Sequence, residues 1–257
     1  MTPGRLLRRA LVGLGTGVTA FAGLMVAEVL VARRGPAPSP GPPLPQGMPA
    51  GPPGVPTDTV VWLGDSTAAG LGASSLDGTV AVRTAGLLGR PVALTVLGHS
   101  GDRVAHVLHS QLPRLAAARP TVVMISIGAN DVTHLTRRSA FRRDYAALLA
   151  GLPPVRQVVV VGIPDMGTSP RVPQPLRAIA GWRGRRMNAD VRRLAARSGA
   201  IYADVAARTG QAFRDHPERY FAHDRYHPDD EGYALWAAAI ASAVRDGSQP
   251  TGDGPAR

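Results

Sequence analysis

Residues 59–66 read TVVWLGDS: an apolar, β-branched run from Thr59 to Leu63 is followed at once by Gly64, Asp65 and Ser66. A continuous apolar run that ends at a glycine is typical of a strand buried on both faces. Four later runs have a similar composition, and the first three of them also end at a glycine: Val92–Leu97, Val122–Ile127, Val158–Val161 and Ile201–Asp204. The sequence therefore predicts a sheet of about five buried strands.

Helical patterns occupy the stretches between and after these runs. The expected helices are Val80–Leu88, Val104–Ala118, Ser139–Leu149, Gln174–Ser198 and Asp229–Arg245. Strands that alternate with helices predict an α/β fold with a central parallel sheet and helices on both faces. In such sheets ligands bind beyond the carboxyl ends of the strands, so the residues just after each strand are the candidates for chemistry.

The composition excludes several kinds of site. Cysteine is absent, which removes disulfides, Cys-ligated zinc and thiol nucleophiles. All 29 basic residues are arginine and the formal net charge is +11, but aromatic residues make up only 5% of the chain. A nucleic-acid interface would interleave basic and aromatic residues or carry a recognisable motif. We therefore expect no nucleic-acid partner; the sequence leaves the oligomeric state open.

The N-terminal region differs in composition from the rest. An apolar run from Ala10 to Ala32 is long enough to cross a bilayer core, and a stretch dense in proline and glycine follows it. The expected divisions are an anchor or signal segment at 1–34, a linker at 35–56, a folded domain at 57–247 and a disordered tail at 248–257. We expect a single-pass anchor in the cell membrane with the folded domain outside the cytoplasm, or a secreted domain if the segment is cleaved.

Reactive side chains gather at the predicted strand ends. GDSTA occupies 64–68, GHSGD 98–102 and GAND 128–131, while DRYHP at 224–228 comes just before the last predicted helix. A serine hydroxyl becomes a good nucleophile only when a neighbouring base removes its proton, and histidine titrates near neutral pH. Ser66, His227 and Asp224 are therefore the candidates for nucleophile, base and the group that orients the base.

These four blocks, in this order, resemble those of the SGNH hydrolase superfamily, also called GDSL-type lipases and esterases. The family letters map onto Ser66, Gly101, Asn130 and His227, and the resemblance covers roughly 57–245. It implies a flavodoxin-like three-layer α/β/α sandwich that hydrolyses carboxylic esters through an acyl-serine intermediate, without a cofactor or metal. It also implies an oxyanion hole formed by the Ser66 and Gly101 backbone N–H groups and the Asn130 side chain. The third block departs slightly from the pattern, because alanine stands where a second glycine is common.

The loop at 163–174 follows a predicted strand end and is rich in proline. Met166 and Val172 in this loop are candidates for substrate binding, and an ordinary surface connection is the alternative. The ester itself is left open: a lipid, a short acyl ester or an acylated carbohydrate. Two other functions also stay open, namely an acyltransferase with the same triad and a catalytically inactive module that binds envelope glycans or lipids.

Overall fold

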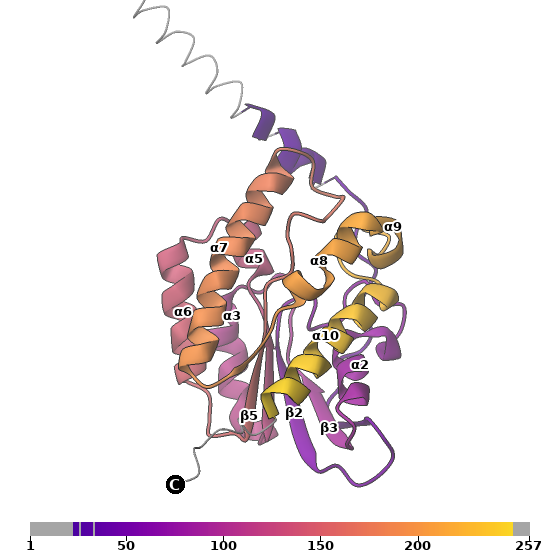
Figure 1. Cartoon of the computed structure of the whole chain (residues 1–257), viewed down its shortest axis with the longest axis vertical. Helices are drawn as coiled ribbons and strands as arrows, with labels where there is room; N and C mark the ends of the chain where they lie inside the picture. Colours follow the sequence, from indigo (N-terminus) through magenta and orange to yellow (C-terminus); the bar gives the residue numbers. More distant parts are fainter. Residues whose placement is uncertain (1–22, 26, 33, 249–257) are drawn as a thin grey trace, which may run out of the picture.

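The computed structural model describes residues 23–25, 27–32 and 34–248, and its centre is a six-stranded sheet (Figure 1). The strand order across the sheet is β1-β3-β2-β4-β5-β6. Their bounds are β1 Met48–Ala50, β2 Asp58–Gly64, β3 Val92–Val96, β4 Val122–Ser126, β5 Gln157–Val161 and β6 Ile201–Ala203. The five strands from β2 to β6 are parallel, and β1 pairs antiparallel with β3.

The connection between the parallel strands reverses direction once. The chain goes from β2 outward to β3, then returns to β4 on the other side of β2 and continues to β5 and β6. This is the order of flavodoxin-like sheets, in which a crevice opens where the direction reverses, here between the carboxyl ends of β2 and β4. The predicted α/β fold is confirmed, with a mixed, mostly parallel sheet in place of a purely parallel one.

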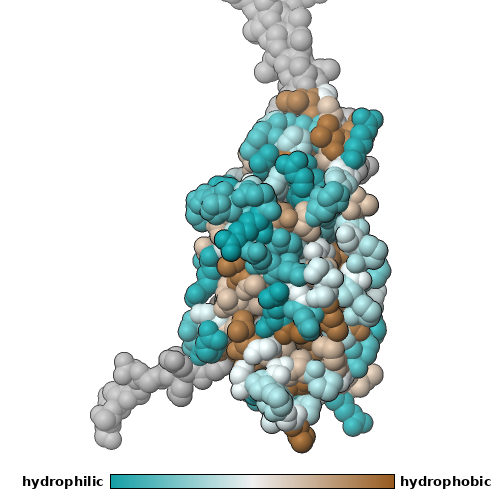
Figure 2. All heavy atoms as spheres, turned by 90° about the vertical axis from the view of Figure 1, so that its right-hand side faces the viewer, coloured by the Kyte–Doolittle hydropathy of each residue, from teal (hydrophilic) through white to brown (hydrophobic). Residues whose placement is uncertain are grey.

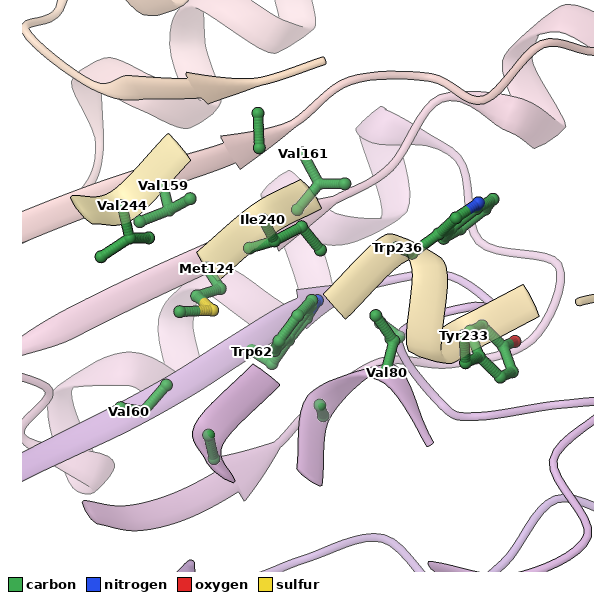
Figure 3. Close-up of a cluster of buried hydrophobic side chains, with 14 of the residues drawn as sticks. Val60, Trp62, Val80, Met124, Val159, Val161, Tyr233, Trp236, Ile240 and Val244 are labelled. Atoms are coloured by element: carbon green, nitrogen blue, oxygen red, sulfur yellow. The ribbon is translucent and has the colours of Figure 1, made fainter. Parts of the chain in front are cut away.

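The helices cover both faces of this sheet. They are α2 Val80–Leu87, α3 Val104–His106, α4 Leu115–Ala118, α5 Ala129–Thr133, α6 Arg138–Ala150, α7 Leu176–Arg197, α8 Val205–Asp215, α9 Pro217–Tyr220 and α10 Asp230–Ser248. Within β2 the buried side chains alternate: Val60 and Trp62 pack with α2 and α10 on one face, and Val61 and Leu63 pack with α6 and α7 on the other. Figure 3 shows Trp62 of β2 and Met124 of β4 beneath Ile240 of α10. The outer surface on the side of α9, α10 and α2 is a patchwork of hydrophilic and hydrophobic residues (Figure 2).

The helix expected at Val104–Ala118 is interrupted. After α3 the chain widens into one π-helical turn at Val107–Gln111, tightens into a 3-10 turn at Leu112–Arg114 and ends in α4. Pro113 has no N–H to donate and its ring crowds the preceding turn, which is the physical reason for the break. Gln111 is the last residue of the π turn, and its side chain is buried.

Part of the predicted linker joins the sheet. Met48–Ala50 forms β1, the Val96 N–H donates to the Pro45 carbonyl, and the Gly47 N–H donates to Thr95 Oγ1. These bonds cover the edge of β3, which would otherwise expose unpaired backbone groups. The division of the chain at residues 34, 56 and 247 stays a prediction.

The prediction of a membrane anchor is not supported by the structure. Most of the Ala10–Ala32 run lies outside the described residues, and no helix within the described ranges is long and apolar enough to span a bilayer. The described end of the run is helical and contacts the folded domain through Glu28, whose carboxylate accepts the Leu176 N–H at 2.7 Å. The single-pass anchor and the cell-membrane location that depended on it are contradicted by these findings.

Candidate active site

The predicted nucleophile lies at the point where the sheet changes direction. Ser66 follows β2, and the Asp65 N–H donates to the carbonyl of Ser126 at the end of β4 at 3.2 Å. Gly64 has a φ of +155°, and a Cβ built there would lie 2.1 Å from the Ser126 carbonyl oxygen. A glycine is therefore required for β2 to pass this close to β4 and turn Ser66 into the crevice.

Ser66, His227 and Asp224 form a continuous line of hydrogen bonds. Ser66 Oγ lies 2.9 Å from His227 Nε2, and His227 Nδ1 lies 2.5 Å from Asp224 Oδ2. The serine and the histidine are 161 positions apart in the sequence, and all three side chains are buried. The structure thus brings together the three residues that the sequence marked as nucleophile, base and orienting group.

The hydrogen bonds around Asp224 fix its charge. Burial by itself raises the pKa of a carboxyl group, but the His227 side chain and the backbone N–H groups of His227 and Tyr226 donate to Asp224 and hold its pKa below the ordinary value. An ionised Asp224 accepts a hydrogen bond from the N–H at Nδ1 of His227 and so keeps the proton on that nitrogen. Nε2 is then left as the acceptor that faces the Ser66 hydroxyl, which is the tautomer a general base needs.

The loop that carries the pair is held from both ends. The Ala222 N–H donates to the His227 carbonyl, and Phe221 forms a β-bridge with Pro228. The Tyr226 ring packs edge-on against the His227 ring, with centroids 5.2 Å apart. The imidazole is therefore confined by packing as well as by hydrogen bonds.

The two other block residues differ in their relation to Ser66. Asn130 lies in α5 and lines the same pocket as Ser66, and its Nδ2 donates to the Asp102 carbonyl of the second block at 2.9 Å. Gly101 is exposed and is not among the residues that line that pocket. Its φ is +85°, and nothing lies within 4 Å of where a Cβ would stand. The backbone conformation, which side chains rarely adopt, is what requires glycine here.

Gln111 is a site residue that the sequence did not reveal. Its Oε1 accepts the Gly64 N–H at 2.9 Å, and its Nε2 donates to the Gly64 carbonyl at 2.7 Å and to Asp102 Oδ2 at 2.8 Å. One amide therefore connects the first and second blocks. Nothing in the amphipathic pattern at 104–118 separates this glutamine from the surface residues around it.

Asp65 supports the turn that presents Ser66. Its Oδ1 accepts both the N–H and the hydroxyl of Thr67, and that hydroxyl lies 3.1 Å from Ser126 Oγ. Burial raises the pKa of Asp65 to about 6 despite these bonds. This geometry suits a residue that braces the loop.

Two hollows meet at His227. The inner pocket has a volume of about 50 Å³ and is lined by Ser66, Asn130 and His227, with Phe213, Phe221 and Trp236 on its apolar side. The outer groove has a volume of about 690 Å³ and is lined by His227 and Asp224 but not by Ser66. Met166 lines both hollows and Val172 lines the outer groove. Both are therefore placed where a substrate could contact them, and their role in substrate binding stays a prediction. Across the described residues, no cluster of three or more His, Cys, Asp or Glu side chains is placed to hold a metal ion.

Solved structures share this architecture. A lipase from a goat rumen metagenome, Lip_vut3, superposes with a TM-score of 0.58 at 20% identity over 73% of this chain and 97% of its own. The acetylxylan esterase Axe2 from Geobacillus stearothermophilus superposes with a TM-score of 0.57 at 20% identity over 74% of this chain and 94% of its own. At such identities the likeness establishes the fold.

Comparison of sequences identifies the family as well as the fold. The GDSL-like esterase Rv1075c of Mycobacterium tuberculosis is 33% identical over 201 residues, which are 75% of this chain and 63% of the length of that relative. The profile of the GDSL-like Lipase/Acylhydrolase family matches residues 62–235, a stretch that runs from the strand before Ser66 to the helix after His227. The chain therefore belongs to the GDSL-like lipase/acylhydrolase family.

Proposed function

We propose that this protein hydrolyses carboxylic esters through a covalent acyl-serine intermediate, with Ser66 as nucleophile. The observation that carries the proposal is the hydrogen-bonded line from Ser66 Oγ through His227 to Asp224 beside a pocket. Membership of the family supports hydrolysis of an ester in general. The similar proteins described above, an esterase, a lipase and an acetylxylan esterase, are by name ester-cleaving proteins as well.

In the first half-reaction, His227 Nε2 takes the proton from Ser66 as Oγ attacks the ester carbonyl carbon. The positive charge that forms on the imidazole faces the ionised Asp224 across 2.5 Å. As the tetrahedral intermediate collapses, the same Nε2 delivers the proton to the alcohol oxygen and the C–O bond breaks. In the second half-reaction, water replaces the alcohol and the steps repeat, releasing the acid and free Ser66.

The negative charge on the carbonyl oxygen needs hydrogen-bond donors. We assign this role to the Asn130 amide and to the backbone N–H groups of Ser66 and Gly101. The position of Asn130 in the lining of the Ser66 pocket supports its part in this set. Loss of one such donor typically lowers turnover by about 10²–10³-fold.

The test is hydrolysis of p-nitrophenyl acetate by the full chain, by Ser66→Ala and by His227→Ala. Exposed Ser139 and His109 supply matched control variants, Ser139→Ala and His109→Ala. We expect both triad variants to fall to the background rate and both controls to keep wild-type rates. Wild-type activity in a folded Ser66→Ala protein would refute the assignment of the nucleophile. Product analysis with an added alcohol separates hydrolysis from acyl transfer, because transfer yields a new ester.

A further inference from the structure

The outer groove is walled by three parts of the chain that lie far apart in the sequence. Val29, Ala32 and Pro38 come from the N-terminal segment, Leu176 and Ile179 come from the first turns of α7, and His227 belongs to the proposed triad. Its volume of about 690 Å³ falls within the range of about 300–1,000 Å³ that is usual for ligand pockets. The groove therefore begins at the catalytic histidine and has room for a sizeable group.

Polar contacts hold the N-terminal wall in place. Glu28 is 5% exposed, and its carboxylate accepts the Leu176 N–H, one of the N–H groups at the start of α7 that lack a partner within the helix. Arg171 Nε donates to the Ala32 carbonyl at 2.8 Å, and its Nη1 donates to the Pro36 carbonyl at 2.7 Å and to the Asp224 carbonyl at 3.4 Å. One arginine thus ties the N-terminal segment to the loop that carries the Asp224–His227 pair.

The groove presents an apolar surface. Both arginines that line it direct their N–H groups to backbone carbonyls: Arg171 as above, and Arg183 to the carbonyls of Val132 and Thr136. Between them lie apolar side chains, among them Leu135, which is 65% exposed at the rim. An apolar lining of this kind favours an apolar occupant.

The two hollows correspond to the two halves of an ester. In an acyl-serine the acyl carbon is bonded to Ser66 Oγ, and of the two hollows only the inner pocket is lined by Ser66, so that pocket is the one nearest to the acyl group. That pocket measures about 50 Å³, and since one water needs about 10–15 Å³, it holds a group of only a few heavy atoms. The leaving alcohol takes its proton from His227, which lines the outer groove as well.

We propose that the outer groove, including its N-terminal wall, binds the alcohol half of the substrate, and that the substrates are short-acyl esters of long-chain or bulky apolar alcohols. The proposal rests on the proposed function, because it uses Ser66 and His227 in their catalytic roles. It assigns Val29 and Ala32 as specificity-determining residues in a segment outside the matched family region at 62–235.

The experiment compares isomeric esters on the full chain. Octyl acetate and methyl nonanoate have the same atoms, but the long chain is on the alcohol side in the first and on the acyl side in the second. We expect kcat/KM to rise from methyl acetate to octyl acetate, by up to about four-fold per methylene that becomes buried. We expect octyl acetate to exceed methyl nonanoate by at least ten-fold. A preference for methyl nonanoate would overturn the assignment of the two hollows.

Two variants test the groove itself. Ala32→Trp fills it from the N-terminal wall and Ala180→Trp fills it from α7. Each is expected to lower the ratio of kcat/KM for octyl acetate to that for methyl acetate by ten-fold or more. Leu87→Trp, at an exposed apolar position on α2, is the matched control and should keep the wild-type ratio. Wild-type ratios in both groove variants would refute the proposal. Failure of the proposed function gives a different result. In that case Ser66→Ala keeps its activity on every ester, whereas failure of the groove proposal leaves Ser66→Ala inactive and only the ratio between the two esters unchanged in the groove variants.

Discussion

Gln111 holds Gly64 by both ends of its amide, accepting the Gly64 N–H at 2.9 Å and donating to the Gly64 carbonyl at 2.7 Å. All three groups are buried, and Gly64 lies two residues before the proposed nucleophile. Gln111 is the last residue of the π-helical turn at Val107–Gln111. A local irregularity in one helix thus supports the turn that carries Ser66.

Substitution of this side chain should disturb both stability and turnover. Gln111→Met keeps a similar size but leaves the Gly64 N–H and carbonyl without their partners, and each unsatisfied buried group costs about 1–3 kcal/mol. We expect a lower free energy of unfolding by urea and a fall in kcat larger than any change in KM, because the turn carrying Ser66 loosens. An unchanged kcat in the folded variant would show that the amide does not position the nucleophile.

Asp224→Asn should separate the orienting effect of Asp224 on the His227 ring from the space that its side chain fills. The amide fills the same space, but it can donate to His227 Nδ1 and so favours the wrong tautomer at Nε2. In a Ser-His-Asp system this change lowers kcat by about 10⁴-fold. The measurement is p-nitrophenyl acetate hydrolysis with circular dichroism as the control for folding. A loss of less than ten-fold would contradict the orienting role of Asp224.

The raised pKa of Asp65 predicts a pH dependence of stability. The folded-state pKa is about 6 and the ordinary value is 3.8, so the folded protein binds more protons than the unfolded chain between these values. The stability associated with protonated Asp65 is therefore complete below pH 3.8 and is lost as the pH rises through about 6. At about 1.4 kcal/mol per unit, the shift corresponds to about 3 kcal/mol.

Asp65→Asn removes this titration while keeping an acceptor for Thr67. Urea unfolding of wild type and variant at pH 4 to pH 7 isolates the contribution, because the other carboxyl groups titrate in both proteins. We expect the free energy of unfolding of the variant to gain on that of wild type as the pH rises. Parallel curves over this range would rule out a raised pKa.

A pair of glycine substitutions should have opposite effects. Gly64→Ala places a Cβ 2.1 Å from the Ser126 carbonyl oxygen at a φ of +155°, so β2 and β4 must separate and the unfolding free energy should drop by several kcal/mol. Gly86 lies in α2 with nothing within 4 Å of a built Cβ. Gly86→Ala should instead stabilise the protein, by about 1 kcal/mol. Similar melting temperatures for the two variants would contradict the close approach at Gly64.

The sequence by itself determined the parallel strands and the blocks that follow them. A strand such as Val122–Ser126, buried on both faces, must be apolar along its whole length, and this requirement is local enough to be read from one stretch. The rule that parallel strands end at the same edge then predicts that Ser66 and Asn130 lie near each other. The edge strand β1 gave no such signal, because three residues including Pro49 carry no period and pair only where β3 offers a free edge.

Only the tertiary structure decided which distant groups meet. Glu28 is 148 positions from Leu176, and its apolar neighbours resemble a membrane span until the carboxylate is seen to cap α7. Gln111 and Arg171 likewise act through backbone groups of other elements, and any residue type can supply a carbonyl or an N–H. The local sequence pattern predicts whether a side chain is buried in the core or exposed to solvent. The pattern does not predict which backbone group a polar side chain will bind, because that depends on how the helices and strands pack.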